Sequence, residues 1–150
     1  MLQGGQEMKF KLFIDKNHDD EVIVYAHEES ELTKQIEDIV TKSESQIVAY
    51  IDREAVVLEL ADVYCFVVED NKVFAITSKD KLKVKSRLYQ LEEMLPHTFV
   101  KVNQSCIANI KMIKSFDSKI SGSLLVRFKN GYSDYVSRRQ LKVVKERMGL

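Results

Sequence analysis

The chain has 150 residues, of which 45% are hydrophobic and 31% are charged, and its formal net charge at pH 7 is zero. This composition supports one domain, or a small module joined to a compact second one, and it excludes a chain that is disordered throughout. No apolar run approaches the ~20 residues that span a bilayer, so we predict a soluble, cytoplasmic protein.

The first 45 residues predict a polar leader followed by a small β-β-α unit. Residues 1–7 have neither the basic nor the apolar region of a secretory signal, and we interpret them as a leader or a cloning remnant. Residues 8–14 alternate polar and apolar side chains, as a half-buried strand does, and residues 22–25 predict a second strand. A helix is expected between Ser30 and Ser43, where apolar residues recur at helical spacing behind a serine N-cap.

The rest of the chain predicts a β-rich domain with one helix in the middle and one at the end. The middle helix begins near Ser86 and ends at Pro96, because proline cannot continue a helix; the terminal helix covers residues 139–148. Asn130-Gly131 predicts a type I′ hairpin turn. The absence of βαβ alternation argues against a doubly wound parallel sheet. Strands are predicted at residues 47–51, 55–60, 63–68, 73–77, 99–102, 110–116, 123–128 and 132–136.

Candidate catalytic residues are few. His18, His27 and His97 lie in loops or at helix edges, far in sequence from Cys65 and Cys106. The chain contains none of the motifs that bind zinc, activate a serine nucleophile or cradle a nucleotide phosphate. We therefore predict no enzyme activity, no catalytic residue, no metal, no cofactor and no small-molecule substrate. The cysteines are interpreted as buried, reduced thiols, with a redox pair as the alternative.

The net charge of zero conceals an asymmetry between the two halves of the chain. Residues 1–78 carry 7 Lys and Arg against 17 Asp and Glu, whereas residues 79–150 carry 16 against 6. A basic half favours the binding of a polyanion such as nucleic acid. The alternative is that the acidic half pairs with the basic half, within one chain or across a dimer, and charge alone does not separate the two.

Three neutral hydrogen-bonding residues, Asn103, Gln104 and Ser105, follow the predicted strand 99–102. Asn and Gln pair with the edge of adenine in the major groove, whereas Ser and Lys contact phosphates. The alternative is an ordinary turn, since Asn and Ser stabilise turns through bonds to the nearby backbone.

A second candidate segment, Ser137-Arg138-Arg139, lies where the last predicted strand meets the terminal helix. A serine there caps the helix, and the first backbone N–H groups of a helix favour a phosphate. Two adjacent arginines repel each other unless an anion is present, and arginine is the usual reader of guanine. The alternative is that one arginine pairs with an internal carboxylate such as Asp134.

Several segments of the second part of the chain belong to one recognisable pattern: the hairpin 63–77, the segment Phe99–Asn109 (FVKVNQSCIAN), Ile113, Ser115, Gly131 and the segment Val136–Arg139. Through these segments, residues 57–150 resemble the LytTR family of bacterial DNA-binding domains. Asn103 departs from the pattern, because many members have His there, and any titratable role at that position is lost. Ala108 replaces the commoner Val, which is a conservative change in the core.

This resemblance implies an α+β fold of mostly antiparallel strands that binds duplex DNA through loops in place of a recognition helix. Such loops enter successive major grooves, commonly with two domains on a direct-repeat site. The two polar segments described above become the base-reading elements, the loop around Ser78–Lys81 becomes a third contact, and two further lysines serve phosphates. The DNA-binding residues implied by position are Lys79, Lys81, Lys101, Asn103, Gln104, Ser105, Lys111, Ser137, Arg138 and Arg139.

The short front unit resembles the front segment of a stand-alone LytTR subgroup that is often paired with a small membrane protein. We expect this unit to dimerise the protein or to contact such a partner. The function predicted is a sequence-specific transcription regulator that binds duplex DNA as a homodimer; the alternative is a protein-interaction module of a regulatory system with a membrane partner. The expected division is a leader at 1–7, the β-β-α unit at 8–45 and a LytTR-like DNA-binding domain at 46–150.

Overall fold

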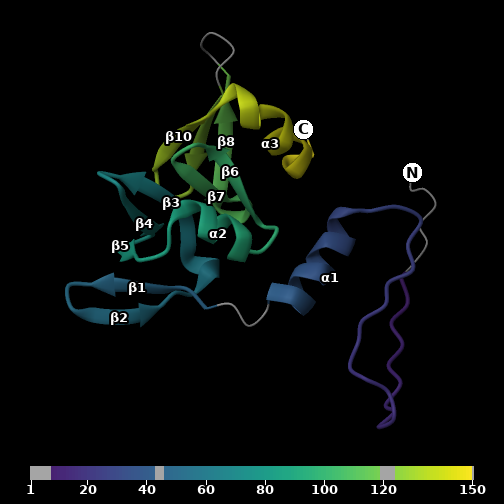
Figure 1. The fold of residues 1–150 in the computed structure, drawn as a ribbon. Helices are drawn as coiled ribbons and strands as arrows, with labels where there is room; N and C mark the ends of the chain where they lie inside the picture. Colours follow the sequence, from purple (N-terminus) through teal and green to yellow (C-terminus); the bar gives the residue numbers. More distant parts are fainter. Residues whose placement is uncertain (1–7, 43–45, 119–123, 150) are drawn as a thin grey trace.

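A computed structural model describes residues 8–42, 46–118 and 124–149 of the chain, so the predicted leader lies outside the described residues. Strands dominate from residue 48 onward (Figure 1). The elements are α1 (Glu31–Lys42), β1 (Val48–Ile51), β2 (Glu54–Val57), the 3-10 helix η1 (Leu60–Asp62), β3 (Val63–Glu69), β4 (Lys72–Thr77), β5 (Lys81–Val84), α2 (Leu88–Met94), β6 (Phe99–Asn103), β7 (Cys106–Asn109), the 3-10 helix η2 (Ile110–Met112), β8 (Ile113–Asp117), β9 (Leu124–Phe128), β10 (Ser133–Val136) and α3 (Arg138–Met148).

The strands of the described residues form two antiparallel sheets. The larger sheet has the order β2-β1-β5-β4-β3-β7-β6, and the smaller one has the order β10-β9-β8. The sheets meet where the backbone N–H of Ser137, just after β10, donates to the carbonyl of Val102 in β6 at 2.8 Å. The prediction of a β-rich α+β fold with mostly antiparallel strands is confirmed. No helix of the described residues is long and apolar enough to cross a membrane.

The two faces of the larger sheet bury separate apolar clusters. Side chains of β3 alternate between them, so that Phe66 points toward α2 and Val67 points toward the smaller sheet. On the first face Leu91 of α2 is fully buried, and the ring centroids of Phe66 and Phe99 lie 5.8 Å apart. On the second face Val144 of α3 is fully buried with the smaller sheet. Both faces of the larger sheet are therefore covered around β3, and the loops at its two ends stay accessible.

The two cysteines are buried and free, as the sequence predicts. Cys65 in β3 and Cys106 in β7 lie on neighbouring antiparallel strands. A hydrogen bond to Cys65 and burial both raise the pKa of the Cys106 thiol well above its ordinary value. Because the thiolate is the reactive form, this shift favours an inert thiol that serves the core.

The type I′ turn forms in a different hairpin from the one predicted. Asp70 and Asn71 both have positive φ, 51° and 61°, as the two-residue β3–β4 turn requires. Gly131 also has positive φ, but Asn130 does not, so the Asn130-Gly131 prediction is wrong. The Gly131 N–H instead donates to the carbonyl of Phe128 at 3.0 Å, which makes Asn130 an inner residue of an ordinary turn and leaves only glycine left-handed.

The two predicted N-terminal strands do not form. Within residues 8–30 the structure contains no strand, and Phe10 and Tyr25 are 87% and 93% exposed. Figure 1 shows this arm extending away from the two sheets. A pair of strands is marginal in water without a third strand or a helix to cover one face. The alternating pattern is present, but neither sheet of the described residues includes this arm.

The predicted helix α1 does form and begins at the predicted cap. The backbone N–H of Thr33 donates to Ser30 Oγ at 3.3 Å, and the Ser30 N–H donates to Thr33 Oγ1 at 2.9 Å. These reciprocal bonds satisfy donors that the first turn of a helix leaves without partners.

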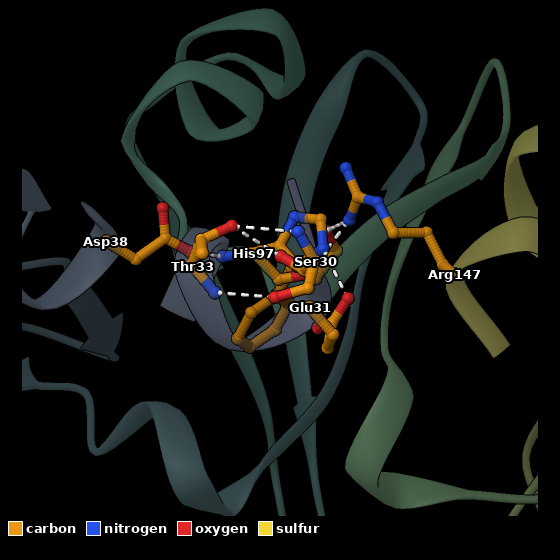
Figure 2. A network of polar contacts seen from close by, with 7 residues as sticks. Ser30, Glu31, Thr33, Asp38, His97 and Arg147 are labelled. Atoms are coloured by element: carbon orange, nitrogen blue, oxygen red, sulfur yellow. Dashed lines mark hydrogen bonds and ion pairs between the residues drawn. The ribbon is translucent and has the colours of Figure 1, made fainter. Parts of the chain in front are cut away.

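Helix α1 docks on the domain by its polar side (Figure 2). Glu31 Oε2 lies 2.9 Å from His97 Nε2, and the carboxylate of Asp38 accepts from the His97 backbone N–H. Arg147 of α3 approaches the same loop and donates to the carbonyls of His97 at 2.9 Å and Phe99 at 3.2 Å. Burial lowers the pKa of Arg147, and the nearby carboxylates of Glu31 and Asp38 act in the opposite direction. The loop before β6 thus joins α1 to α3.

Candidate nucleic-acid interface

Three connections lie together at one end of the larger sheet. The backbone N–H of Val68, near the β3–β4 turn, donates to the carbonyl of Ser105 in the β6–β7 loop at 2.9 Å. The bond from Ser137 to Val102 brings the β10–α3 junction to the same end of β6. Both polar segments predicted as base readers therefore meet at this end, although more than 30 residues separate them in the sequence.

Asn103 is the structural link between these segments. Its side chain is buried, with 2% of its surface exposed. Its amide nitrogen donates to Asp134 Oδ1 at 2.9 Å and to the carbonyl of Tyr135 at 2.8 Å, and its Oδ1 accepts from the Ser105 N–H at 2.8 Å. Both amide donors are occupied by the protein, so a contact with a base would require these bonds to break. In contrast, Gln104 and Ser105 are exposed.

Arg138 and Arg139 are exposed in the first turn of α3. Ser137 caps this helix as predicted, accepting from the Gln140 N–H at 3.3 Å. Asp134, the carboxylate offered as an internal partner, is bonded to Asn103 and to the Tyr135 N–H. No carboxylate in the described part of the chain forms a salt bridge with either arginine. Two unneutralised guanidinium groups therefore lie at the end of the sheet that carries Gln104.

The loop that contains Lys79 lies at the other end of the larger sheet. Thr77, which precedes this loop, pairs with Val63 at the start of β3. Lys79 is exposed there, whereas the ammonium of Lys81 pairs with the carboxylate of Glu69 and lies 4.8 Å from the Phe74 ring. The fold therefore does not bring Lys79 together with the two polar segments, and it partly neutralises Lys81.

The two remaining predicted DNA contacts, Lys101 and Lys111, do not lie at the end of the sheet that carries Gln104. Lys101 is half-buried in the middle of β6, and Lys111 is exposed in η2. Lys111 follows Asn109, which pairs with Phe99 at the end of β6 opposite Asn103. Lys111 is thus nearer to the end of the sheet that carries Lys79.

The β3–β4 turn lies beside the β6–β7 loop, and the sequence did not reveal this neighbour. Its residues, Glu69–Lys72, predicted a hairpin through the Asp-Asn pair. Nothing in the linear sequence indicates that this turn lies beside Ser105, because the contact depends on the pairing of β3 with β7.

Comparison with known proteins identifies the family to which the chain belongs. The family model of the LytTr DNA-binding domain matches residues 53–149. The chain belongs to the LytTR family. An uncharacterized HTH-type transcriptional regulator of Staphylococcus aureus (strain NCTC 8325 / PS 47) is 34% identical to it over 95% of this chain and 99% of that protein, and its counterpart in strain MRSA252 matches equally well. A solved LytTr DNA-binding domain from Bacillus cereus has a TM-score of 0.67 at 19% identity, over 71% of this chain and 99% of that one.

The LytTR match includes both polar segments and the β3–β4 turn, and it excludes α1 and the arm before it. The Staphylococcus aureus relatives nevertheless match 95% of the chain, so their similarity extends into this front segment. The front segment therefore belongs to what this LytTR protein shares with those relatives.

Proposed function

We propose that this LytTR protein regulates transcription by binding duplex DNA in a sequence-specific way through the end of its larger sheet. The observation that carries the proposal is the pair of exposed, unneutralised arginines, Arg138 and Arg139, at the end that carries the exposed Gln104. Arginine pairs bidentately with guanine, and glutamine pairs with adenine, which gives these side chains the means to read base edges. The start of α3 adds backbone N–H groups that suit a phosphate.

In this proposal the loops enter the groove and no recognition helix is used. The relatives are named HTH-type, but α2 and α3 are separated by five strands, and no helix-turn-helix pair occurs among residues 46–118 and 124–149. Ser105 and Ser137 contact phosphates, and Asn103 positions the two segments. Lys101 and Lys111, with Lys79 and Lys81, add sequence-independent positive charge.

Selection of bound sequences from a random duplex pool tests this function. We expect enrichment of a direct repeat whose halves lie about one helical turn apart. The affinity for that site should fall with salt with a log–log slope of about −0.9 per neutralised phosphate. The variant with both Arg138→Ala and Arg139→Ala should lose the enrichment. A pool without any enriched sequence, bound through salt-sensitive contacts alone, would contradict specific regulation.

We further propose that the front segment joins two copies of the chain. Because α1 docks by its polar side, its apolar residue Ile39 is 67% exposed, and Phe10, Phe13 and Tyr25 of the arm are more exposed still. Three aromatic side chains bury on the order of 150–250 Å² each, which approaches the ~800 Å² that one partner contributes to a stable interface. A second copy supplies an identical apolar surface and unpaired backbone groups for the arm. A small membrane protein is the alternative partner.

Replacing Phe10, Phe13 and Tyr25 with serine should convert a dimer into a monomer at micromolar concentration in sedimentation equilibrium. The serine variant should still bind a half-site, because these residues lie outside the LytTR match. Tyr89→Ser is the matched control, since this tyrosine is also exposed but lies on α2. A wild-type protein that stays monomeric with and without DNA would contradict the dimer.

A further inference from the structure

One face of the larger sheet is covered over only part of its width. The apolar cluster beside the smaller sheet takes side chains from β3, β4, β6 and β7, and among the described residues it takes none from β1 or β5. Figure 1 shows β1 and β2 at the edge that lies away from β8, β9 and β10. Val48 in β1 and Val57 in β2 are 38% and 54% exposed. The part of this face that β1 and β5 form is therefore open to a partner.

Strand register puts three lysines on this open part. Lys83 pairs with Tyr50 on one side and with Phe74 on the other, and Phe74 packs against the cluster beside the smaller sheet. Side chains directly opposite in paired strands share a face, so Lys83 points to the same side as these two rings. Lys72 lies two residues before Phe74, and Lys85 lies two residues after Lys83, which is the spacing of one face. All three lysines are exposed, and together with the two rings they form what we term the basic face.

The charges of the basic face are not balanced within the described part of the chain. Lys81, further along β5, contacts the Phe74 ring and pairs with Glu69, so these two charges neutralise each other. No salt bridge of the described residues involves the three lysines of the basic face. The Lys85 ammonium lies 4.9 Å from the centroid of the Tyr50 ring, a contact that orients the cation without removing its charge. Positive charge beside aromatic rings suits a partner that carries carboxylates and apolar side chains together.

The turn within the N-terminal arm carries the opposite charge. Asp15 begins this turn, and its Oδ1 accepts from the Asn17 N–H at 3.0 Å. Three further carboxylates follow at Asp19, Asp20 and Glu21, and all four are exposed. Asp15 Oδ2 lies 3.7 Å from His18 Nε2, whereas the other three form no salt bridge with any described residue. We term these four carboxylates the acidic tip.

The residues on both sides of the acidic tip are apolar. Ile14 and Val22 are 82% and 58% exposed. The tip therefore matches the basic face in apolar character as well as in charge, because Val48 and the rings of Tyr50 and Phe74 lie among the lysines. A DNA backbone would match the charge of the basic face but would leave Ile14 and Val22 in water, so the arm is the better match.

Helix α1 holds the arm at the other edge of the larger sheet. It docks on the loop before β6, and three strands separate β6 from β5 in the sheet. Within the described residues, no hydrogen bond or salt bridge joins residues 8–29 to residues 46–149. In a dimer with two-fold symmetry the two arms run antiparallel, so the tip of each arm lies beside the domain of the other copy. A second copy is thus the natural source of the acidic tip.

We propose that the basic face binds the acidic tip of a second copy of the chain. The inference rests on the dimer proposed above, and it adds the surface of the domain on which the arm docks. It also accounts for the opposite charges of the two halves of the chain, because each half then meets its complement across the dimer.

Charge reversal tests this contact by sedimentation equilibrium. The face variant carries Lys72→Glu, Lys83→Glu and Lys85→Glu, and the tip variant carries Asp19→Lys, Asp20→Lys and Glu21→Lys. Each variant alone should dimerise at least about tenfold more weakly than the wild type, because like charges meet in both contacts. An equimolar mixture of the two should recover the association of the wild type, since both of its contacts again pair opposite charges. Raising the salt toward ~1 M, where the screening length is about 3 Å, should reduce these differences.

A charge-matched control replaces Lys114, Lys142 and Lys145 with glutamate; all three are exposed and lie outside the basic face. The control should dimerise as the wild type does, and it should form fewer mixed dimers with the tip variant than the face variant does. A monomeric wild-type protein would contradict the dimer and this contact together. A wild-type dimer whose face variant dimerises normally would overturn this contact alone, and if that variant also loses affinity for duplex DNA, the basic face contacts phosphates instead. Equal thermal midpoints establish that each variant is folded.

Discussion

Arg139→Ala is expected to cost about 1–3 kcal/mol of binding free energy at one base pair of the operator and to remove the preference for guanine there. Arg139 is exposed in the first turn of α3 and has no salt-bridge partner among the described carboxylates, so its guanidinium is free to form two parallel bonds to a guanine edge. Gln104→Ala is expected to relax the preference at a different base pair. The measurement is the affinity for operators that carry each of the four bases at each position.

The matched control for this prediction is Arg139→Lys. Lysine keeps the positive charge but lacks the planar fork of donors that pairs with guanine. The lysine variant should therefore retain the salt dependence of the wild type and lose the base preference. An alanine variant that weakens every sequence equally would assign Arg139 to a phosphate instead.

Asn103→Ala is expected to lower both the free energy of unfolding and the affinity for every operator. The side chain is buried and serves Asp134, Tyr135 and Ser105, and each buried group left without a partner costs about 1–3 kcal/mol. Because Asn103 joins the β6–β7 loop to β10, the preferences at the Gln104 and Arg139 positions should weaken together. Chemical denaturation measures the first effect, and the base-substitution series measures the second.

The Asn103→Asp variant tests the same role of Asn103 more sharply. Aspartate has nearly the same shape as asparagine, but it lacks the amide donors and places a second carboxylate beside Asp134. Like charges at this distance disfavour ionisation of both groups, so the variant should be less stable than the wild type at pH 7 and regain part of that stability near pH 4, where one carboxyl binds a proton. If Asn103→Ala instead leaves stability unchanged and alters one base pair only, Asn103 reads that base directly.

Local sequence signals predicted most of the elements. Ser30 and Ser137 cap helices as expected, Pro96 follows the end of α2, and the Asp70-Asn71 pair forms its hairpin turn. Each of these features depends on residues within a few positions, which is why it can be recognised without knowledge of the fold. The turn at Asn130 shows where such local prediction stops. Asparagine adopts either sign of φ, and its structural neighbours decide which sign it takes: φ is positive at Asn71 but not at Asn130.

The front segment shows why a correct pattern can give a wrong element. Residues 8–14 alternate as a strand does, but a strand also needs a paired neighbour, and the described chain supplies none. The apolar stripe of α1 was recognised correctly, yet the helix docks by Glu31 and Asp38 onto the loop at His97 (Figure 2). Periodicity identifies which side chains share a face, and it does not identify which face the protein covers.

The sequence by itself determined the β-rich class, the two polar segments and the excess of basic residues in the second half, because these follow from residue type and spacing. The tertiary structure decided which of these residues are available. Pairing of β3 with β7 brings the β3–β4 turn to Ser105, and contact of β10 with β6 brings Arg139 to the same end. The same contacts bury Asn103 and leave Lys79 at the far end. Exposure and proximity arise from contacts between residues far apart in the chain, so only the folded protein could divide the predicted set into exposed side chains and side chains that hold them in place.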